Sequence, residues 1–273
     1  LAQYYLADGW RVSGSDAVRS EITDDLKKRG ARIFIGQRAA NIPPAGGPDL
    51  VVYSAAIKSD HPELVEAKKK GIKTLLYSQA VGELTKKYYT IAVAGSHGKS
   101  TTTALIGLIL IKAGLDPTII IGTKLKELDP TSSRLGSGLR GTGTNFRLGK
   151  SEYLVLEADE YARSFHNYFP KITVLTNIDK EHLDVYKNLS GVLVGFRKYL
   201  HNVQSGGYIV ANGDDNNVRS TLKFQVPKSK IILYKKGNHK LSITGVHNQY
   251  NAEAAWQAVK LLGVKKIVAD KVF

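Results

Sequence analysis

The stretch AGSHGKSTTT at residues 94–103 decides the fold of this chain. It follows the apolar run 88–93, which is typical of a strand, and precedes a pattern over 101–113 that is typical of a helix. A strand, a turn that contains glycine, and a Lys-Ser pair opening a helix form the layout that binds a nucleotide triphosphate. The sequence therefore predicts an α/β domain in which this turn faces phosphates.

The turn supplies two functional side chains together with its backbone N–H groups. Lys99 is expected to reach the β- and γ-phosphate oxygens, and the Ser100 hydroxyl is expected to ligate Mg²⁺. The standard motif has glycine five residues before Gly98, where this chain has Val93, so the loop is a shortened form. A plain Gly-Ser turn before a helix is the alternative. The residues predicted here to bind ATP are Gly95, Ser96, His97, Gly98, Lys99, Ser100 and Thr101.

Length and composition exclude several classes of protein. A chain of 273 residues, 42% hydrophobic and 23% charged, favours two globular domains that each bury a core. The absence of cysteine excludes a disulfide framework and thiolate metal sites. The sequence shows no secretory signal and no apolar run long enough to span a bilayer. Membrane insertion is therefore not expected, and the cytoplasm is the expected compartment.

The net charge of +15 calls for a separate interpretation. The basic residues are scattered, and the short runs 68–70, 86–87 and 265–266 lie at predicted helix ends, where cations suit the helix dipole. No zinc-finger, helix-turn-helix or aromatic stacking signature accompanies them. A basic field also attracts anionic small substrates. Nucleic-acid binding is therefore not expected, although it stays open as an alternative.

The first part of the chain alternates strand and helix patterns. Ser20 and Gly30 are suited to cap the two ends of one helix. The alternation predicts a parallel sheet with helices on both faces. It breaks near 85–88, before the phosphate loop. The predicted strands are 10–13, 32–35, 49–54 and 73–77, and the predicted helices are 20–30 and 62–71.

The second part is again α/β. The stretch 124–149, rich in Gly, Ser, Thr and Arg, has no clear pattern and is predicted to be a mobile loop that faces the substrate. The predicted strands are 118–121, 153–157, 172–177, 208–212 and 231–234, and the main predicted helices are 101–113, 189–203 and 251–262.

Acidic and polar side chains follow two of these strands, as ligand sites on open parallel sheets require. Residues 157–160, EADE, end one strand, and residues 176–184, TNIDKEHLD, end the next. Phosphoryl transfer needs oxygen ligands for Mg²⁺ beside the phosphate loop, and Glu157 is predicted to supply one. His182 is predicted to ligate a second metal ion or to contact the transferred phosphate. The alternative is that Glu157 and Glu160 are solvated acids and that His182 begins a helix.

Three further polar residues have two interpretations each. Asp16 ends a predicted strand, where doubly wound folds place an acid that binds ribose, but an aspartate there also suits a turn or a helix cap. Asn248 and Asn251 precede or open the last predicted helix, and their amides suit an adenine edge or a ribose. Either asparagine also suits a helix cap.

Taken together, these segments resemble the muramyl ligase family, ATP-dependent enzymes that build the peptide stem of peptidoglycan. The family's shortened loop, G-[T/S]-x-G-K-[S/T]-[T/S], matches residues 95–101, and its histidine form is similar to the branch that acts on UDP-N-acetylmuramate. The other segments that carry the resemblance are 14–16, 53–58, 144–149, 157–160, 176–184 and 247–252.

The resemblance implies a reaction. The γ-phosphoryl group of ATP passes to the muramate carboxylate, and the amine of L-alanine then displaces phosphate from the acyl phosphate. Lys99, Glu157 and His182 are implied as catalytic residues, and Ser100, Glu157 and His182 as ligands of Mg²⁺. Asn248 and Asn251 are implied to hold adenosine. The residues implied to bind UDP-N-acetylmuramate are Asp16, Ser54, His97, Asn145 and Arg147.

The resemblance also implies a domain division. Residues 1–87 correspond to a Rossmann-like domain that binds the UDP-sugar, and residues 88–273 to the central ATP-binding ligase domain. The family's glycine-rich turn before Leu1 is expected to be missing, and so is the third domain after the last helix, which carries the amino-acid contacts.

Besides nucleic-acid binding, two alternatives of function stay open. Tyr161 is the residue seen in a recycling branch of the family that attaches a whole tripeptide to UDP-N-acetylmuramate. A non-catalytic nucleotide-binding module without the third domain is the other. The sequence predicts neither the oligomeric state nor, beyond the resemblance, the amino acid that is joined.

Overall fold

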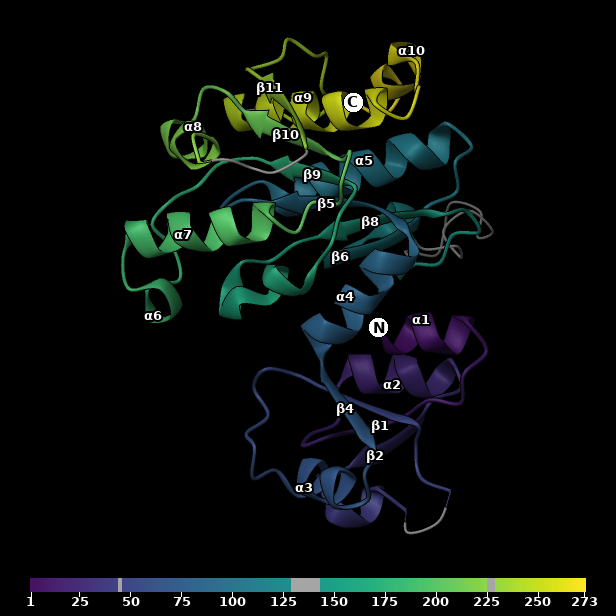
Figure 1. Cartoon of the computed structure of the whole chain (residues 1–273). Coiled ribbons are helices and arrows are strands. Elements are labelled where there is room, and N and C mark those ends of the chain that lie inside the picture. The colour runs from purple at the N-terminus through teal and green to yellow at the C-terminus, as the bar shows by residue number, and fades with distance from the viewer. Residues whose placement is uncertain (44–45, 129–142, 225–228) are drawn as a thin grey trace. The chain divides into compact units, whose positions relative to one another are not determined.

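The computed structural model describes residues 1–43, 46–128, 143–224 and 229–273, and in these ranges the chain forms two compact units, Leu1–Val81 and Gly82–Phe273 (Figure 1). The predicted division at residues 87 and 88 stays a prediction. The change of pattern predicted near 85–88 falls where helix α4 (Tyr77–Lys87) ends and strand β5 (Tyr89–Ala94) begins. Val81 and Leu84 are buried in α4, and this apolar face stabilises the helix up to its charged end.

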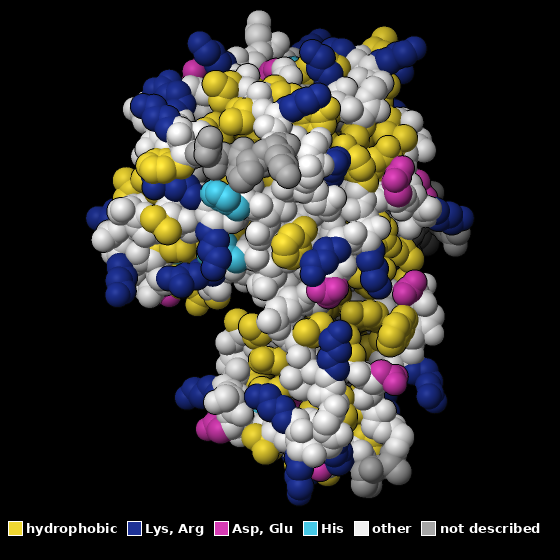
Figure 2. All heavy atoms as spheres, in the orientation of Figure 1, with side chains coloured by type: hydrophobic (Ala, Val, Ile, Leu, Met, Phe, Trp, Pro, Cys, Tyr) yellow, Lys and Arg dark blue, Asp and Glu magenta, His cyan; other side chains and the backbone are white. Residues whose placement is uncertain are grey.

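The basic side chains are spread over the surface and do not form one large patch on the face that Figure 2 shows. Lys and Arg side chains occur singly or in small groups over the face seen in Figure 2. The runs 68–70 and 86–87 lie at the ends of helices, as predicted. The run 265–266 instead begins a helix, where Lys266 Nζ pairs with Asp270 at 2.7 Å. Among the helices of the described residues, none is both long and apolar enough to cross a membrane.

The first unit contains the predicted parallel strands. β1 pairs with β2, and β3 pairs with β4, both in parallel register. Within the described residues these are two separate ladders rather than one continuous sheet. The elements are α1 (Ala2–Ala7), β1 (Ser13–Asp16), α2 (Glu21–Lys28), β2 (Arg32–Ile35), η1 (Ala39–Asn41), β3 (Leu50–Tyr53), α3 (Pro62–Lys69) and β4 (Lys73–Leu76).

Local chemistry explains where these elements begin. Ser20 caps α2 through a capping box with Thr23, each side chain accepting a hydrogen bond from the other residue's backbone N–H, at 3.3 and 2.9 Å. The strand predicted at 10–13 is wrong, because β1 covers Ser13–Asp16 and begins three residues later. The Trp10 backbone N–H donates to Tyr5 O at 2.9 Å, and the Trp10 side chain donates to Asp8, so this residue closes α1 instead of starting β1.

The second unit is built on one sheet with the strand order β11-β10-β9-β5-β8-β6-β7 in the described residues. All neighbouring strands are parallel except β6 and β7. β5 is central, so the loop that follows it lies between the ends of β8 and β9. The strands are β5 (Tyr89–Ala94), β6 (Thr118–Leu125), β7 (Thr144–Arg147), β8 (Tyr153–Glu157), β9 (Ile172–Leu175), β10 (Tyr208–Asn212) and β11 (Lys230–Tyr234).

The helical elements of this unit are α5 (Lys99–Lys112), η2 (Lys126–Leu128), η3 (Tyr161–Asn167), α6 (Leu183–Tyr186), α7 (Leu189–Leu200), α8 (Asn216–Leu222), α9 (Val246–Lys260) and α10 (Lys266–Asp270). The predicted loop at 124–149 needs correction at both ends, where β6 extends to Leu125 and β7 covers Thr144–Arg147. Residues 129–142 of that predicted loop lie outside the described residues.

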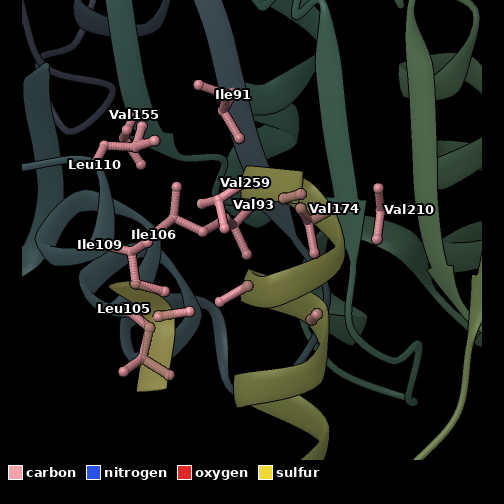
Figure 3. Packing of buried hydrophobic residues seen from close by; sticks show 14 of the residues in the cluster. Ile91, Val93, Leu105, Ile106, Ile109, Leu110, Val155, Val174, Val210 and Val259 are labelled. Carbon is pink, nitrogen blue, oxygen red and sulfur yellow. The ribbon is translucent and has the colours of Figure 1, made fainter. Parts of the chain in front are cut away.

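The hydrophobic core of the second unit fixes the position of the phosphate loop, because it contains residues of both β5 and α5, which flank that loop. Leu105, Ile106, Ile109 and Leu110 of α5 pack against Val259 of α9 and against the buried valines and isoleucine of the central strands (Figure 3). Val174 of β9 belongs to this cluster, whereas the neighbouring Thr173 points to the other face and its hydroxyl lies 2.7 Å from Tyr199 of α7. Helices thus cover both faces of this sheet, consistent with the α/β pattern predicted for the second part of the chain.

Candidate active site

The turn between β5 and α5 leaves no room for side chains at its two glycines. Gly95 has φ +136°, and a Cβ atom there would lie 2.0 Å from Thr176 Oγ1. Gly98 has φ +80°, and a Cβ atom there would lie 2.3 Å from Asn251 Oδ1. Both positions therefore require glycine for conformation and for space.

The segment after β9 braces the turn through hydrogen bonds. The Asn177 side-chain amide pairs with the His97 backbone, accepting from N at 2.8 Å and donating to O at 2.9 Å. The Asp179 N–H donates to Ser96 Oγ at 2.8 Å. Thr176 Oγ1 also donates to His97 O, at 2.7 Å. The predicted segment 176–184 therefore does meet the loop and holds its shape, a role that was not predicted from the sequence.

Lys99 is held inside its own loop. Its Nζ donates to Gly95 O at 2.8 Å and to Ser96 O at 3.1 Å, and it lies 3.0 Å from Glu160 Oε2. Glu160 is only 1% exposed. Burial raises the pKa of its carboxyl, and the charge of Lys99 acts in the opposite direction. The sequence placed Lys99 in the loop and Glu160 in the acidic segment 157–160, but it did not predict that the two side chains pair.

Ser100 and Glu157 meet beside the loop. Ser100 Oγ donates to Glu157 Oε1 at 3.0 Å, and Glu157 Oε2 accepts from the Gly122 N–H at 2.7 Å. A hydroxyl oxygen and a carboxylate oxygen so close together are the hard ligands that Mg²⁺ prefers, usually with water completing the shell. The residues present therefore fit the predicted ion.

His182 lies on the other side of Glu160. Its backbone is left-handed, with φ +52°, at the start of α6. Its Nε2 lies 3.5 Å from Glu160 Oε1, and its ring centroid lies 5.1 Å from that of Tyr161. Ligand atoms of Asp159, Glu160 and His182 all lie within 4.8 Å of one another, a spacing that allows them to share a cation. His182 thus begins a helix, as the alternative interpretation had it, and also lies beside Glu160, while its role toward a metal ion or phosphate stays a prediction.

His97 projects from the tip of the loop. Its side chain is 61% exposed, with Nδ1 3.6 Å from Glu181 and Nε2 3.7 Å from Asp179. Both carboxylates follow β9, so this histidine has acidic neighbours on one side and solvent on the other. It is therefore free to contact a ligand that approaches the loop from outside.

Asn248 and Asn251 are buried within α9, whose N-cap is Gly245. The helix begins five residues before the predicted start, so the interpretation of either asparagine as the cap is wrong. Asn251 Nδ2 donates to Asn248 Oδ1 at 3.3 Å, and Asn251 packs against Gly98. The pair connects α9 directly to the phosphate loop.

Arg147 and Asn145 lie on β7, at the edge of the sheet. Arg147 forms an ion pair with Asp116 and donates to Pro117 O at 2.7 Å. The hydrogen bond from Arg147 lowers the pKa of the Asp116 carboxyl. Asn145 is exposed. In this structure, therefore, Arg147 has protein partners at the position where sequence analysis predicts a substrate contact.

The first unit has a cavity of about 460 Å³, lined by residues of β1 and β3 and by the predicted residues Asp16 and Ser54. Glu63 contributes to its wall and accepts hydrogen bonds from Ser15 Oγ and Asn41 Nδ2, both at 2.6 Å. His61 also lines it, and its buried Nε2 has no hydrogen-bond partner in the part of the chain that the structure describes.

Sequence reasoning missed these last two residues. Glu63 occupies the first turn of α3, where an acid is ordinary, and His61 is an isolated histidine before a proline. No sequence motif marks either of them. Glu160 is different, because it lies in the quoted EADE segment, and its burial between Lys99 and His182 was the missing observation.

Two descriptions of one protein family match this chain. The description "Mur ligase family, catalytic domain" matches residues 1–89, and "Mur ligase middle domain" matches residues 93–244, more than half of the chain. A UDP-N-acetylmuramate–L-alanine ligase of Aquifex aeolicus is 39% identical over 298 residues, covering 99% of this chain and 62% of the relative. The enzyme of the same name from Acetivibrio thermocellus is 44% identical over 224 residues, covering 82% of this chain and 44% of the relative.

Solved structures share the fold. The UDP-N-acetylmuramate:L-alanyl-gamma-D-glutamyl-meso-diaminopimelate ligase from Neisseria meningitides superposes with a TM-score of 0.82 at 24% identity, covering 98% of this chain and 91% of that chain. The UDP-N-acetylmuramate-alanine ligase of Thermotoga maritima gives 0.77 at 24% identity, covering 99% and 64%. This chain spans about three fifths of the length of the first curated relatives. The matched domains and the shared fold establish that the chain belongs to the Mur ligase family.

Proposed function

We propose that this protein is an ATP-dependent ligase that joins L-alanine to the carboxylate of UDP-N-acetylmuramate during peptidoglycan synthesis in the cytoplasm. The proposal rests on the glycine turn that carries Lys99. Beside this turn, Ser100 Oγ and Glu157 Oε1 lie 3.0 Å apart, as two ligands of one Mg²⁺ ion could. The names of the relatives support the choice of substrates.

The first step is the transfer of the γ-phosphoryl group of ATP to a carboxylate oxygen of the muramate. The bond from the γ-phosphorus to the bridging oxygen breaks, ADP leaves, and an acyl phosphate forms. This step depends on positioning and charge neutralisation. The N–H groups of the turn and the N-terminus of α5 would face the phosphates, and Lys99 would pair with their oxygens. Mg²⁺ held by Ser100 and Glu157 would neutralise further phosphate charge.

The second step is amide-bond formation. The amine of L-alanine attacks the acyl carbon, phosphate leaves with the bonding electrons, and the amine gives up a proton. We place His182 on the acyl-phosphate side of the site or at a second metal ion, because it lies beside Glu160 and close to Lys99. Asn248 and Asn251 would hold adenosine from the adjoining helix.

The nucleotide sugar is assigned to the first unit. The cavity with Asp16 and Ser54 has the size of a small-molecule pocket, and Asp16 ends a parallel strand, where ribose-binding acids occur. His97, Asn145 and Arg147 are proposed to contact the substrate in the second unit. For Arg147 this contact requires an exchange of its pairing with Asp116.

The test is phosphate release from ATP by the intact polypeptide. Release should require both UDP-N-acetylmuramate and L-alanine, and L-serine, glycine and the tripeptide should support less. Lys99→Ala should lower the rate by about 100-fold or more while the circular dichroism spectrum stays unchanged. Normal turnover by that variant would contradict the loop assignment, and a preference for the tripeptide would favour the recycling reaction.

A further inference from the structure

Lys99 and Glu160 form a nearly buried ion pair across the phosphate loop. The Lys99 side chain is 13% exposed and the Glu160 side chain 2% exposed, and Nζ lies 3.0 and 3.2 Å from the two carboxylate oxygens. An ion pair so well removed from water interacts more strongly than a surface pair. It therefore influences where Lys99 lies before a nucleotide arrives.

The backbone of Glu160 is itself held in place. Its backbone oxygen accepts a hydrogen bond from Tyr186 Oη at 2.7 Å and another from the Arg163 N–H at 3.0 Å. Its neighbour Asp159 differs, because it is exposed and its Oδ1 accepts from the Tyr161 N–H at 3.0 Å. Of these two adjacent acids, only Glu160 contacts Lys99.

The three donors of Lys99 are all engaged on the protein. They are directed to Gly95 O, Ser96 O and Glu160. An ammonium group has three N–H bonds, so Lys99 cannot add strong contacts to phosphate oxygens without giving up some of these. Nucleotide binding and the Lys99–Glu160 pair therefore compete for the same ammonium group.

We propose that Glu160 is a positioning residue that holds Lys99 against the phosphate loop and competes with the nucleotide phosphates for it. This inference rests on the proposed function, since it takes Lys99 to be the phosphate-binding lysine. When Lys99 moves to phosphate, the buried Glu160 carboxylate loses this ion pair and, in the part of the chain that the structure describes, keeps its contact with His182, whose Nε2 lies 3.5 Å from Oε1. The cost of leaving that carboxylate weakens nucleotide binding and favours the return of Lys99 when ADP leaves.

The test measures ADP binding to the chain by calorimetry, in EDTA so that no divalent cation contributes. Glu160→Gln keeps the shape of the side chain and removes its charge, so ADP should bind about fivefold more tightly than to the wild type. Asp159→Asn is the matched control. It removes an adjacent exposed charge that does not contact Lys99, and it should change the affinity by less than about twofold.

A double-mutant cycle separates competition for Lys99 from general charge repulsion. In the Lys99→Ala background, the further change Glu160→Gln should give no gain in ADP affinity. An equal gain in that background, or no gain in Glu160→Gln alone, would overturn the inference while leaving the nucleotide site intact. If wild-type ADP binding were absent, the proposed function would fail with it. Thermal unfolding of each variant identifies any loss of fold, which would weaken binding rather than tighten it.

Discussion

At the scale of single residues, Gly95 is the tightest point of the active site. Its φ of +136° disfavours any side chain, and a Cβ atom would collide with Thr176 Oγ1 at 2.0 Å. Gly95→Ala should therefore shift the loop, lower ADP affinity by about tenfold or more, and lower the free energy of unfolding by about 1–3 kcal/mol. Calorimetric binding and urea denaturation measure the two effects.

Gly114→Ala is the matched control for backbone strain. Gly114 also has positive φ, at +78°, but a Cβ atom there would have no neighbour within 4 Å. This variant should lose about 1 kcal/mol of stability and keep its ADP affinity. Equal loss of binding in both variants would show that the contact with Thr176 is unimportant.

The sequence could predict those site residues whose chemistry is written in a local motif. Gly95, Lys99 and Ser100 follow from the spacing of one turn, because the strand and helix that flank it are readable from the same stretch. Glu160 could not be assigned in this way. Its contact with Lys99 spans 61 positions and exists because β8 lies beside β5 in the sheet, which is a matter of tertiary structure.

At the scale of elements, α7 shows how one helix face secures the sheet. Phe196 is fully buried, with its ring centroid 5.2 Å from that of Phe165, whereas Val194 in the same helix is 56% exposed. Phe196→Ala should lower the free energy of unfolding by about 3–5 kcal/mol because it leaves a cavity. Val194→Ala should change it by no more than about 0.5 kcal/mol. Urea denaturation of both variants checks this, and similar losses would contradict the packing described.

Elements with a strong local pattern were predictable, and those set by tertiary contacts were not. β2, β8 and β10 have the predicted bounds, because each is a short apolar run between turn residues. The start of α9 was missed because Asn248 and Asn251 resemble caps, yet both are buried inside the helix. β7 was missed because it is a four-residue edge strand that depends on β6 for its pairing.

At the scale of the whole molecule, a half-buried histidine connects stability to pH. His166 stacks on Phe165 and its Nε2 lies 2.9 Å from Gly195 O, and burial lowers its pKa from the ordinary value of 6.5. In the window below 6.5 the unfolded chain binds more protons at this residue than the folded chain does, so stability falls as pH decreases.

His166→Gln should therefore show a weaker loss of unfolding free energy than the wild type between about pH 7 and about pH 5. Urea denaturation at several pH values measures the slopes. His201→Gln, which removes an exposed histidine from the end of α7, serves as the comparison for the loss of a histidine as such. An unchanged slope in His166→Gln would contradict the stated role of its burial.

The central claim is that the protein activates a carboxylate by phosphorylation, and oxygen transfer tests it most directly. UDP-N-acetylmuramate labelled with ¹⁸O in its carboxylate is incubated with the protein, ATP and L-alanine, and the released phosphate is analysed by mass spectrometry. An acyl phosphate requires one carboxylate oxygen to leave with phosphate, so the account predicts one ¹⁸O atom in each phosphate released. Unlabelled phosphate, with the amide formed, would contradict it.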